Sequence, residues 1–183
     1  MDYFGIKGAI RRFEQLDDDL LSLVPFEKRV EMTIVGGSAL MMLGLTANTR
    51  QTTDIDVMEA ALEMNGLLER YDMNQHVTNF RFRLPERWFE RRQKLSFEGT
   101  VLDIYAPSNE DLAILKLDAY REVDKRDLED MARSGELDYG LLETIINDDM
   151  ELRVNYDTEE EWEVFKARYH EFMDFVRNFG EGK

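Results

Sequence analysis

The sequence predicts an α+β protein: a mixed β-sheet flanked by helices, followed by a helical C-terminal part. Two observations predict it. Segments with the two-residue period of strands alternate with helical segments up to about residue 106, whereas the periodic segments after that point are helical. We therefore expect an α/β core with an N-terminal helix over residues 1–106 and a helical subdomain over residues 107–183. The length of 183 residues and a hydrophobic share of 43% are sufficient for a buried core.

The first elements of the expected core are a helix, a strand and a second helix. Residues 6–24 carry apolar side chains at helical spacing, and Pro25 ends that run. Residues 30–35 are rich in β-branched side chains and predict a strand. Two glycines and a serine follow at 36–38, and residues 39–45 predict a short apolar helix. The sequence therefore predicts the order strand, glycine turn, helix.

Further strands follow this unit. Residues 53–57 alternate polar and apolar side chains, which predicts a strand, and residues 60–71 return to helical spacing. Residues 76–84 alternate again, which predicts another strand. Residues 94–97 and 100–105 are two short β-prone segments on either side of a glycine, so we expect them to pair as a hairpin.

Two capping patterns open helices in the C-terminal part. Ser108 is followed by acidic residues including Asp111, the pattern of a helix N-cap with acids in the first turn. Thr158 and Glu161 form a capping-box pattern before the last helix. In that helix, residues at three- and four-residue intervals predict core packing rather than a ligand platform: Trp162, Phe165, Tyr169, Phe172, Val176 and Phe179.

Composition excludes several classes of function. The chain has 23 Lys and Arg against 39 Asp and Glu, a formal net charge of −16, and such an excess repels polyphosphate backbones unless a local basic patch overrides it. No cysteine and two histidines exclude a disulfide framework, a thiolate zinc site and a histidine-rich metal cage. Any metal would be held by oxygen. An apolar leader and a membrane-length apolar run are both lacking, so we expect a cytoplasmic protein with no membrane partner.

One segment departs from the acidic average. Residues 81–94 hold two acidic and six basic residues with aromatic side chains between them. One interpretation is a surface that guides RNA or a nucleotide acceptor, and the other is pairing of these cations with the protein's own acids. Both stay open from the sequence. The six basic residues are Arg81, Arg83, Arg87, Arg91, Arg92 and Lys94.

Three acidic residues lie on expected strands. Asp54 and Asp56 are separated by one apolar residue, so on a strand both carboxylates point to one face. Two adjacent carboxylates repel each other unless water solvates them at an exposed strand edge or a divalent cation neutralises them. Asp103 lies between two aliphatic residues of the expected hairpin, where an unpaired carboxylate would be costly to bury.

The glycine turn is a candidate phosphate site. Gly36 and Gly37 precede an expected helix, whose first N–H groups point toward any anion at that end. Glycine permits close approach of a phosphate to the backbone, and the Ser38 hydroxyl adds a donor. Together with the three strand carboxylates, the turn makes a two-metal nucleotide site plausible.

The order of these motifs resembles the nucleotidyltransferase fold of the DNA polymerase beta superfamily. Within it, residues 36–40 followed by Arg50 just before the Asp-Ile-Asp triplet are similar to the abortive-infection AbiEii-like nucleotidyltransferase toxins and their bacterial relatives. The resemblance covers roughly residues 30–132. Later residues that share it are Leu84, Pro85, Trp88, Arg91, Ser108, Asp111, Leu112, Lys116, Leu117, Lys125, Arg126, Asp127, Leu128 and Asp130.

The resemblance implies a set of residue roles. Asp54 and Asp56 would ligate two Mg²⁺ ions, or Mn²⁺ in their place, and Asp103 would hold one ion and help deprotonate the acceptor hydroxyl. The triphosphate would be bound at the glycine turn by Gly36, Gly37 and Ser38, with Arg50 and Lys116 offsetting its charge. Asp127 and Asp130 are secondary candidates, since acids three apart on a helix also form ordinary ion pairs.

The implied activity is Mg²⁺-dependent transfer of a nucleoside monophosphate from an NTP to an acceptor hydroxyl. If the protein behaves as the toxins do, the acceptor is a tRNA 3′ end or a protein hydroxyl, and a cognate antitoxin restrains it. Two alternatives stay open. One is transfer to a small molecule of the aminoglycoside type, which an acidic surface would attract. The other is a catalytically silent nucleotide-binding or interaction module with the same fold.

Overall fold

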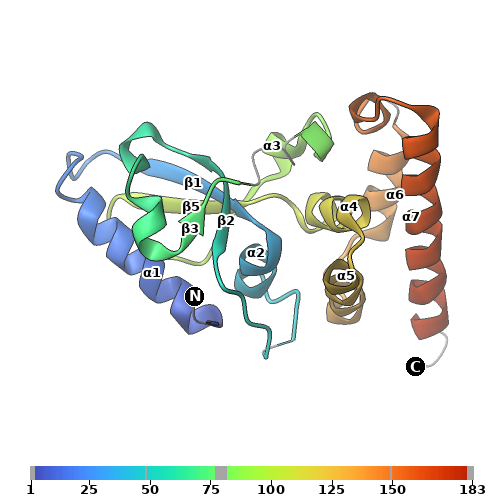
Figure 1. Ribbon diagram of the computed structural model, residues 1–183, viewed down its shortest axis with the longest axis horizontal. Helices are drawn as coiled ribbons and strands as arrows, with labels where there is room; N and C mark the ends of the chain where they lie inside the picture. Colours follow the sequence, from blue (N-terminus) through green and yellow to red (C-terminus); the bar gives the residue numbers. More distant parts are fainter. Residues whose placement is uncertain (1–2, 48, 77–81, 149, 181–183) are drawn as a thin grey trace. The chain divides into compact units, whose positions relative to one another are not determined.

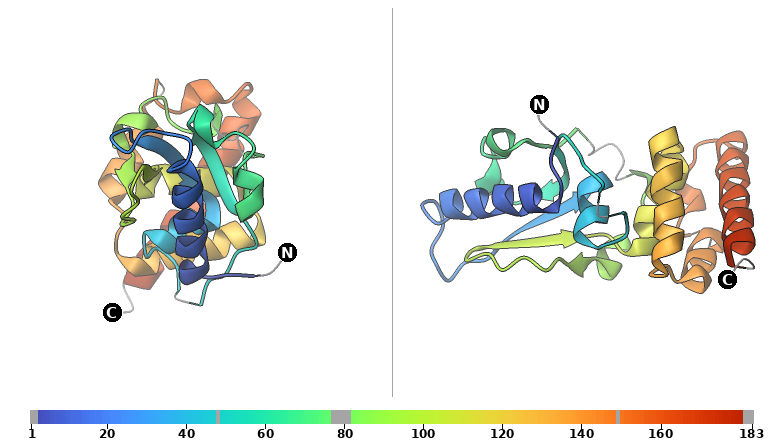
Figure 2. Two further views of the ribbon diagram at one scale, coloured as in Figure 1. Left: turned by 90° about the vertical axis from the view of Figure 1, so that its left-hand side faces the viewer. Right: turned by 90° about the horizontal axis from the view of Figure 1, so that it is seen from below.

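The computed structural model describes residues 3–47, 49–76, 82–148 and 150–180. The chain forms two compact units. The first, which we call the sheet unit, comprises residues 1–81 and 92–107, and the second, the helical unit, comprises residues 82–91 and 108–183. Figures 1 and 2 show the elements of both.

A five-stranded mixed sheet forms the centre of the sheet unit, with the strand order β3-β2-β1-β5-β4. Figure 1 labels β1, β2, β3 and β5 of this sheet. The central strand β1 pairs antiparallel with β2 and parallel with β5. This sheet, together with the helices around it and the helical C-terminal region, confirms the α+β class. The strands are β1 (Val30–Val35), β2 (Ile55–Ala60), β3 (Met73–Asn74), β4 (Gln93–Lys94) and β5 (Leu102–Ala106).

Two helices pack in the sheet unit, α1 (Ile6–Leu20) and α2 (Gly36–Met42). The α2 helix follows β1 directly and packs against β1 and β2. The α1 helix is amphipathic, and the ring of its buried Phe13 meets the ring of Phe97 edge-on at 5.7 Å. The buried Asp17 carboxylate accepts three backbone N–H bonds of 2.6–2.9 Å from residues 100–102, which ties α1 to the start of β5.

The helix expected over residues 60–71 is not present. Strand β2 continues to Ala60, and two short 3₁₀ turns follow, η1 (Leu62–Met64) and η2 (Leu68–Tyr71). Gly66 between them has a φ of +78°, which no right-handed helix accommodates. The apolar spacing of this segment reflects two separate turns that bury Met64 and Leu68, and not one helix.

The strand expected over residues 76–84 falls partly on residues 77–81, which lie outside the described residues. Phe82 and Arg83 are in a 3₁₀ turn, so the prediction is wrong for that end, and the chain continues through Pro85 to α3 (Trp88–Arg91). The expected hairpin is confirmed as the antiparallel pair β4 and β5, although its first strand is shorter than predicted.

The helical unit confirms the cap at Ser108 and the Thr158 half of the expected capping box, whereas the Glu161 carboxylate accepts a hydrogen bond from the Asp157 N–H. Ser108 Oγ accepts a hydrogen bond of 3.1 Å from the Asp111 N–H, and Thr158 Oγ1 accepts one of 3.1 Å from the Glu161 N–H. Besides α3 and the 3₁₀ turn at Phe82 and Arg83, this unit contains α4 (Asn109–Ala119), α5 (Glu122–Ser134), α6 (Tyr139–Asn147), the 3₁₀ turn η4 (Arg153–Asn155) and α7 (Glu159–Gly180).

The first four residues of the predicted α7 stripe pack in the core of the helical unit, whereas Val176 and Phe179 are half-buried. Trp162, Phe165, Tyr169 and Phe172 are all buried. The rings of Trp162 and Phe165 stack with centroids 5.4 Å apart, and Tyr156 tilts against both. Among the described residues, no helix is both long and apolar enough to cross a membrane.

Candidate active site

Two carboxylates meet where strand β2 begins. Asp56 is the second residue of β2 and Asp54 precedes the strand. Asn74 on β3 is the register partner of Asp56. The Asn74 amide nitrogen donates a hydrogen bond of 2.8 Å to Asp54 Oδ2 and one of 3.4 Å to Asp56 Oδ1. One amide therefore reaches both carboxylates, which places them on the same side of the sheet edge.

The glycine turn lies against this pair. Asp56 is also the register partner of Val35, the last residue of β1, and α2 begins at the next residue, Gly36. Gly36 has a φ of +66°, and a Cβ added there would lie 2.4 Å from Asp56 Oδ2. Glycine is required at this position for two reasons, the left-handed backbone and the close approach of the carboxylate.

Beside Gly36, the structure places a cation on the turn. A Cβ at Gly37 would lie 3.1 Å from Arg50 Nη2, so the guanidinium packs over this glycine. Ser38 is buried, and its hydroxyl donates a 3.1 Å hydrogen bond to the Val35 carbonyl. The Ser38 hydroxyl is thus directed into the protein, whereas Arg50 supplies positive charge next to the turn.

A cleft of about 580 Å³ opens beside Asp54 in the sheet unit. In the described part of the chain, the ten residues that line it include three carboxylates and no lysine or arginine. One of the three, Asp72, is paired with Arg12, with 2.6 Å between Oδ2 and Nη2. The polar residues of the lining are Asp54, Asn65, Glu69, Asp72, Asn74, Gln75 and His76.

The structure does not bring Asp103 to this pair. Asp103 on β5 is the register partner of Glu31, whereas Asp56 is the partner of Val35. These two positions of β1 are four residues apart, which is about 13 Å at the usual rise of a strand. Strand β5 runs parallel to β1, so its first residues lie at the start of β1, away from the glycine turn.

Two cations hold the Asp103 carboxylate instead. It pairs with Arg29 and, at 2.8 Å, with the ammonium group of Lys94. The hydrogen bond from Arg29, with the charge of Lys94, keeps the pKa of the Asp103 carboxyl below its ordinary value although burial opposes this. These two ion pairs offset the unfavourable free energy of burying the Asp103 carboxylate.

The residues present fit one divalent cation better than two. Within the described residues, no three histidine, cysteine or carboxylate side chains are grouped so that they could hold a metal ion. The carboxylates that lie close together here are those of Asp54 and Asp56, and the Asn74 amide nitrogen donates a hydrogen bond to each of them. Magnesium is commonly held by one or two carboxylates, with water and substrate phosphates completing its octahedron, so this pair fits one such ion.

Lys116 is buried in the helical unit rather than exposed to a ligand. Its ammonium group lies 2.9 Å from Asp124 Oδ1 and 2.7 Å from Asp127 Oδ2. Asp130, the other secondary candidate, pairs with Arg133 at 3.5 Å. Asp127 thus pairs with Lys116 of α4 and Asp130 with Arg133 of its own helix, which is the ion-pairing alternative that the helical spacing left open.

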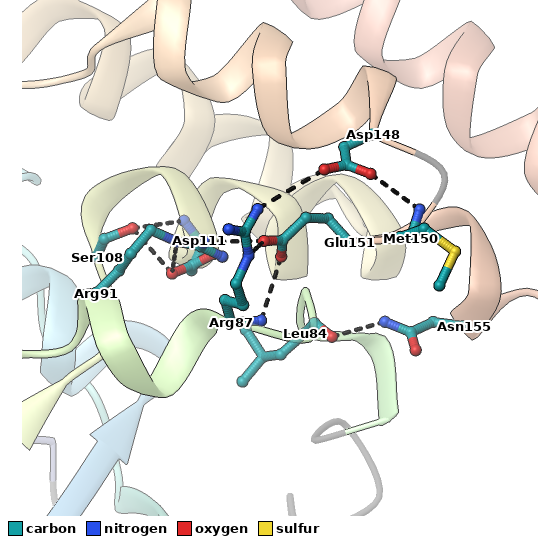
Figure 3. A network of polar contacts seen from close by, with 9 residues as sticks. All are labelled: Leu84, Arg87, Arg91, Ser108, Asp111, Asp148, Met150, Glu151 and Asn155. Atoms are coloured by element: carbon teal, nitrogen blue, oxygen red, sulfur yellow. Dashed lines mark hydrogen bonds and ion pairs between the residues drawn. The ribbon is translucent and has the colours of Figure 1, made fainter.

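The basic segment also pairs with acids of its own unit. In the helical unit, Arg91 binds the Asp111 carboxylate through two hydrogen bonds of 3.1 and 2.8 Å, and Arg87 binds Glu151 (Figure 3). In the sheet unit, Arg92 pairs with Glu31 at 2.7 Å and Lys94 with Asp103. Arg83 lies 3.9 Å from Asp118, and Arg81 is outside the described residues.

Glu151 is the centre of the network in Figure 3. Its side chain is 3% exposed, and it receives hydrogen bonds from both the backbone and the guanidinium of Arg87, with Arg91 3.6 Å away. Asn155 adds a 2.6 Å hydrogen bond to the Leu84 carbonyl. These contacts hold residues 82–91 in the helical unit, although the chain on both sides of them belongs to the sheet unit.

The fold and this site define a class of protein. A mixed sheet whose central strand ends in a glycine turn against two carboxylates, beside a cleft, agrees with the nucleotidyltransferase fold that the sequence resembles. Residues 11–177 match the model of the family described as "Nucleotidyltransferase of unknown function (DUF6036)", and the chain belongs to this family. No curated protein and no solved structure gives a significant match.

Proposed function

We propose that the protein transfers a nucleoside monophosphate from an NTP to an acceptor hydroxyl. The observation that carries this proposal is the Asp54 and Asp56 pair, set against the Gly36 turn at the edge of the cleft. Membership in a nucleotidyltransferase family supports the same reaction class.

The cofactor we propose is a divalent cation, Mg²⁺ or Mn²⁺, held by Asp54 and Asp56. When bound, such an ion neutralises the pair and stabilises charge on the phosphates. A second ion would need another carboxylate. Because Asp103 is paired with Arg29 and Lys94 elsewhere on the sheet, we assign this site one ion held by two carboxylates.

The positions of the side chains suggest separate roles. Asp56 and Arg50 lie at the glycine turn, where Arg50 offsets charge on the triphosphate. Asp54 borders the cleft, so we assign it the role of accepting the proton that the acceptor hydroxyl loses. The acceptor oxygen forms a bond to the α-phosphorus, the bond from that phosphorus to the pyrophosphate oxygen breaks, and pyrophosphate leaves.

Two acceptor classes follow from different observations. The resemblance to AbiEii-like toxins supports a tRNA 3′ end or a protein hydroxyl, with an antitoxin as partner. The carboxylates of the cleft, and the absence of lysine and arginine from its described lining, favour a cationic small molecule of the aminoglycoside type.

The test is label transfer from each of the four α-labelled NTPs, with Mg²⁺ or Mn²⁺, into total RNA, total protein or an aminoglycoside. We expect label in one acceptor class with the wild type and none with Asp56→Asn. The matched variant Asp103→Asn, which removes a strand carboxylate outside the pair, should retain transfer. If no acceptor is labelled and Asp56→Asn leaves metal-dependent NTP binding unchanged, the chain is a silent binding module.

A further inference from the structure

We propose that Asn74 is a positioning residue that holds Asp54 and Asp56 at the spacing at which both can bind one cation. This inference rests on the proposed function, because it assigns a role toward the same cation. Its starting observation is that one amide nitrogen donates to both carboxylates, at 2.8 and 3.4 Å. The Asn74 side chain is thereby the link between two groups that would otherwise repel each other.

A second hydrogen bond sets which way the Asn74 amide points. The backbone N–H of His76 donates to Asn74 Oδ1 at 3.0 Å, so the amide oxygen is engaged on the side away from the carboxylates. The two hydrogens of the amide nitrogen are then directed at Asp54 and Asp56. Pairing of β3 with β2, in which Asn74 is opposite Asp56, holds the backbone of this residue in place.

The chemistry of the amide group excludes direct coordination in this orientation. Magnesium takes oxygen ligands, and the group facing the pair is an amide nitrogen whose hydrogens point toward the carboxylates. The amide engages Asp54 Oδ2 and Asp56 Oδ1, and Asn74 does not use the second oxygen of either carboxylate. Asn74 therefore acts through the two carboxylates, in the way that outer-shell partners orient metal ligands.

The same geometry explains how the pair remains together without a cation. An amide N–H dipole offsets part of the repulsion between two carboxylates, and a bound cation offsets the rest. Removing the amide takes away one of the groups that offset this repulsion, so the carboxylates depend more on the cation to stay together. Loss of Asn74 should therefore weaken cation binding, and a high cation concentration should compensate for it.

The experiment measures binding of Mn²⁺ alone to the full chain by calorimetry, independently of any transfer activity. Asn74→Ala should weaken Mn²⁺ binding by roughly tenfold, the low end for loss of an outer-shell partner. Circular dichroism checks that the variant is folded. Asn65→Ala removes an amide from the same cleft that has no hydrogen bond to the pair in the described structure, and it should bind Mn²⁺ as the wild type does.

Asn74→Asp is the second variant, because it replaces the donor with a third carboxylate of the same size. Without a cation, repulsion should lower its melting temperature below that of the wild type, and Mn²⁺ should raise that temperature by more than it does for the wild type. In a transfer assay, Asn74→Ala should raise the Mg²⁺ concentration needed for half-maximal rate and recover most of its rate at saturating Mg²⁺.

The outcomes separate this inference from the proposed function. If Asp54→Ala and Asp56→Ala abolish Mn²⁺ binding but Asn74→Ala binds with wild-type affinity, the role of Asn74 is wrong and the cation site stands. If the wild type binds no Mn²⁺, with or without NTP, both the role of Asn74 and the proposed cation site are wrong. If Asn74→Ala weakens binding and Asn65→Ala does not, the positioning role is supported.

Discussion

The carboxylate of Asp56 lies directly against the backbone of Gly36, so that a methyl group added at Gly36 would be 2.4 Å from Asp56 Oδ2. This contact joins the end of β1 to the start of β2 and leaves no room for a side chain between the turn and the pair.

Gly36→Ala should lower the free energy of unfolding by more than the roughly 1–2 kcal/mol that a left-handed backbone costs an ordinary residue. It should also displace Asp56 and weaken Mn²⁺ binding by at least about tenfold. Gly44→Ala is the matched control, because Gly44 has a similar φ of +71° but nothing within 4 Å of the added Cβ. Equal loss of Mn²⁺ affinity in both variants would contradict the contact with Asp56 as the cause.

Asp103 should contribute to the stability of the protein rather than to the proposed cation site. Asp103→Asn should keep Mn²⁺ affinity and transfer activity but lower the free energy of unfolding by about 1 kcal/mol, since Arg29 and Lys94 are partly exposed and solvent screens their pairs. Chemical denaturation of the two proteins measures the stability change. Loss of Mn²⁺ binding in this variant would show instead that Asp103 takes part in the cation site.

The stability that Asp103 contributes should depend on pH. The pKa of its carboxyl is lowered in the folded protein from an ordinary value of 3.8. Its contribution is therefore fully present above pH values near 3.8 and is lost as the pH falls through the lower pKa of the folded state. The denaturation midpoints of the wild type and Asp103→Asn should differ at pH 6 and converge once the pH falls below the pKa of Asp103 in the folded protein. A series of buffers at constant ionic strength measures both midpoints.

Glu151→Gln should destabilise the helical unit by about 3 kcal/mol, because it removes the buried carboxylate that pairs with Arg87 and lies 3.6 Å from the half-buried guanidinium of Arg91. Urea denaturation followed by circular dichroism measures this change. The exposed neighbour Glu86→Gln should change the free energy of unfolding by less than about 0.5 kcal/mol. Equal effects of the two substitutions would refute the importance of the network in Figure 3.

Lys116→Met should lower the free energy of unfolding by about 3 kcal/mol, because Asp124 and Asp127 lose the buried ammonium group that lies between them. Its NTP affinity, measured well below the melting temperature, should equal that of the wild type. A loss of NTP affinity larger than about tenfold in a folded variant would instead assign Lys116 to the triphosphate, as the family resemblance implies.

Local patterns in the sequence were sufficient for much of the fold. The strand before Gly36, the caps at Ser108 and Thr158, and the aromatic face of α7 were predicted because each depends on residues a few positions apart. The same is true of Asp54 and Asp56, whose proximity comes from their spacing beside one strand. The prediction of one helix over residues 60–71 is wrong, because two 3₁₀ turns separated by Gly66 produce apolar spacing similar to that of a helix.

Long-range pairing decided the rest. Asp103 is separated from the carboxylate pair by the parallel register of β5 with β1, and no local pattern encodes a register between strands about 70 residues apart. Asn74 lies on a strand of two residues, too short to show a period, yet its amide reaches both carboxylates. The partners of Lys116 and Glu151 likewise depend on which helices and turns pack together. The sequence determined the local elements and the carboxylate pair, whereas the tertiary structure decided which distant side chains meet them.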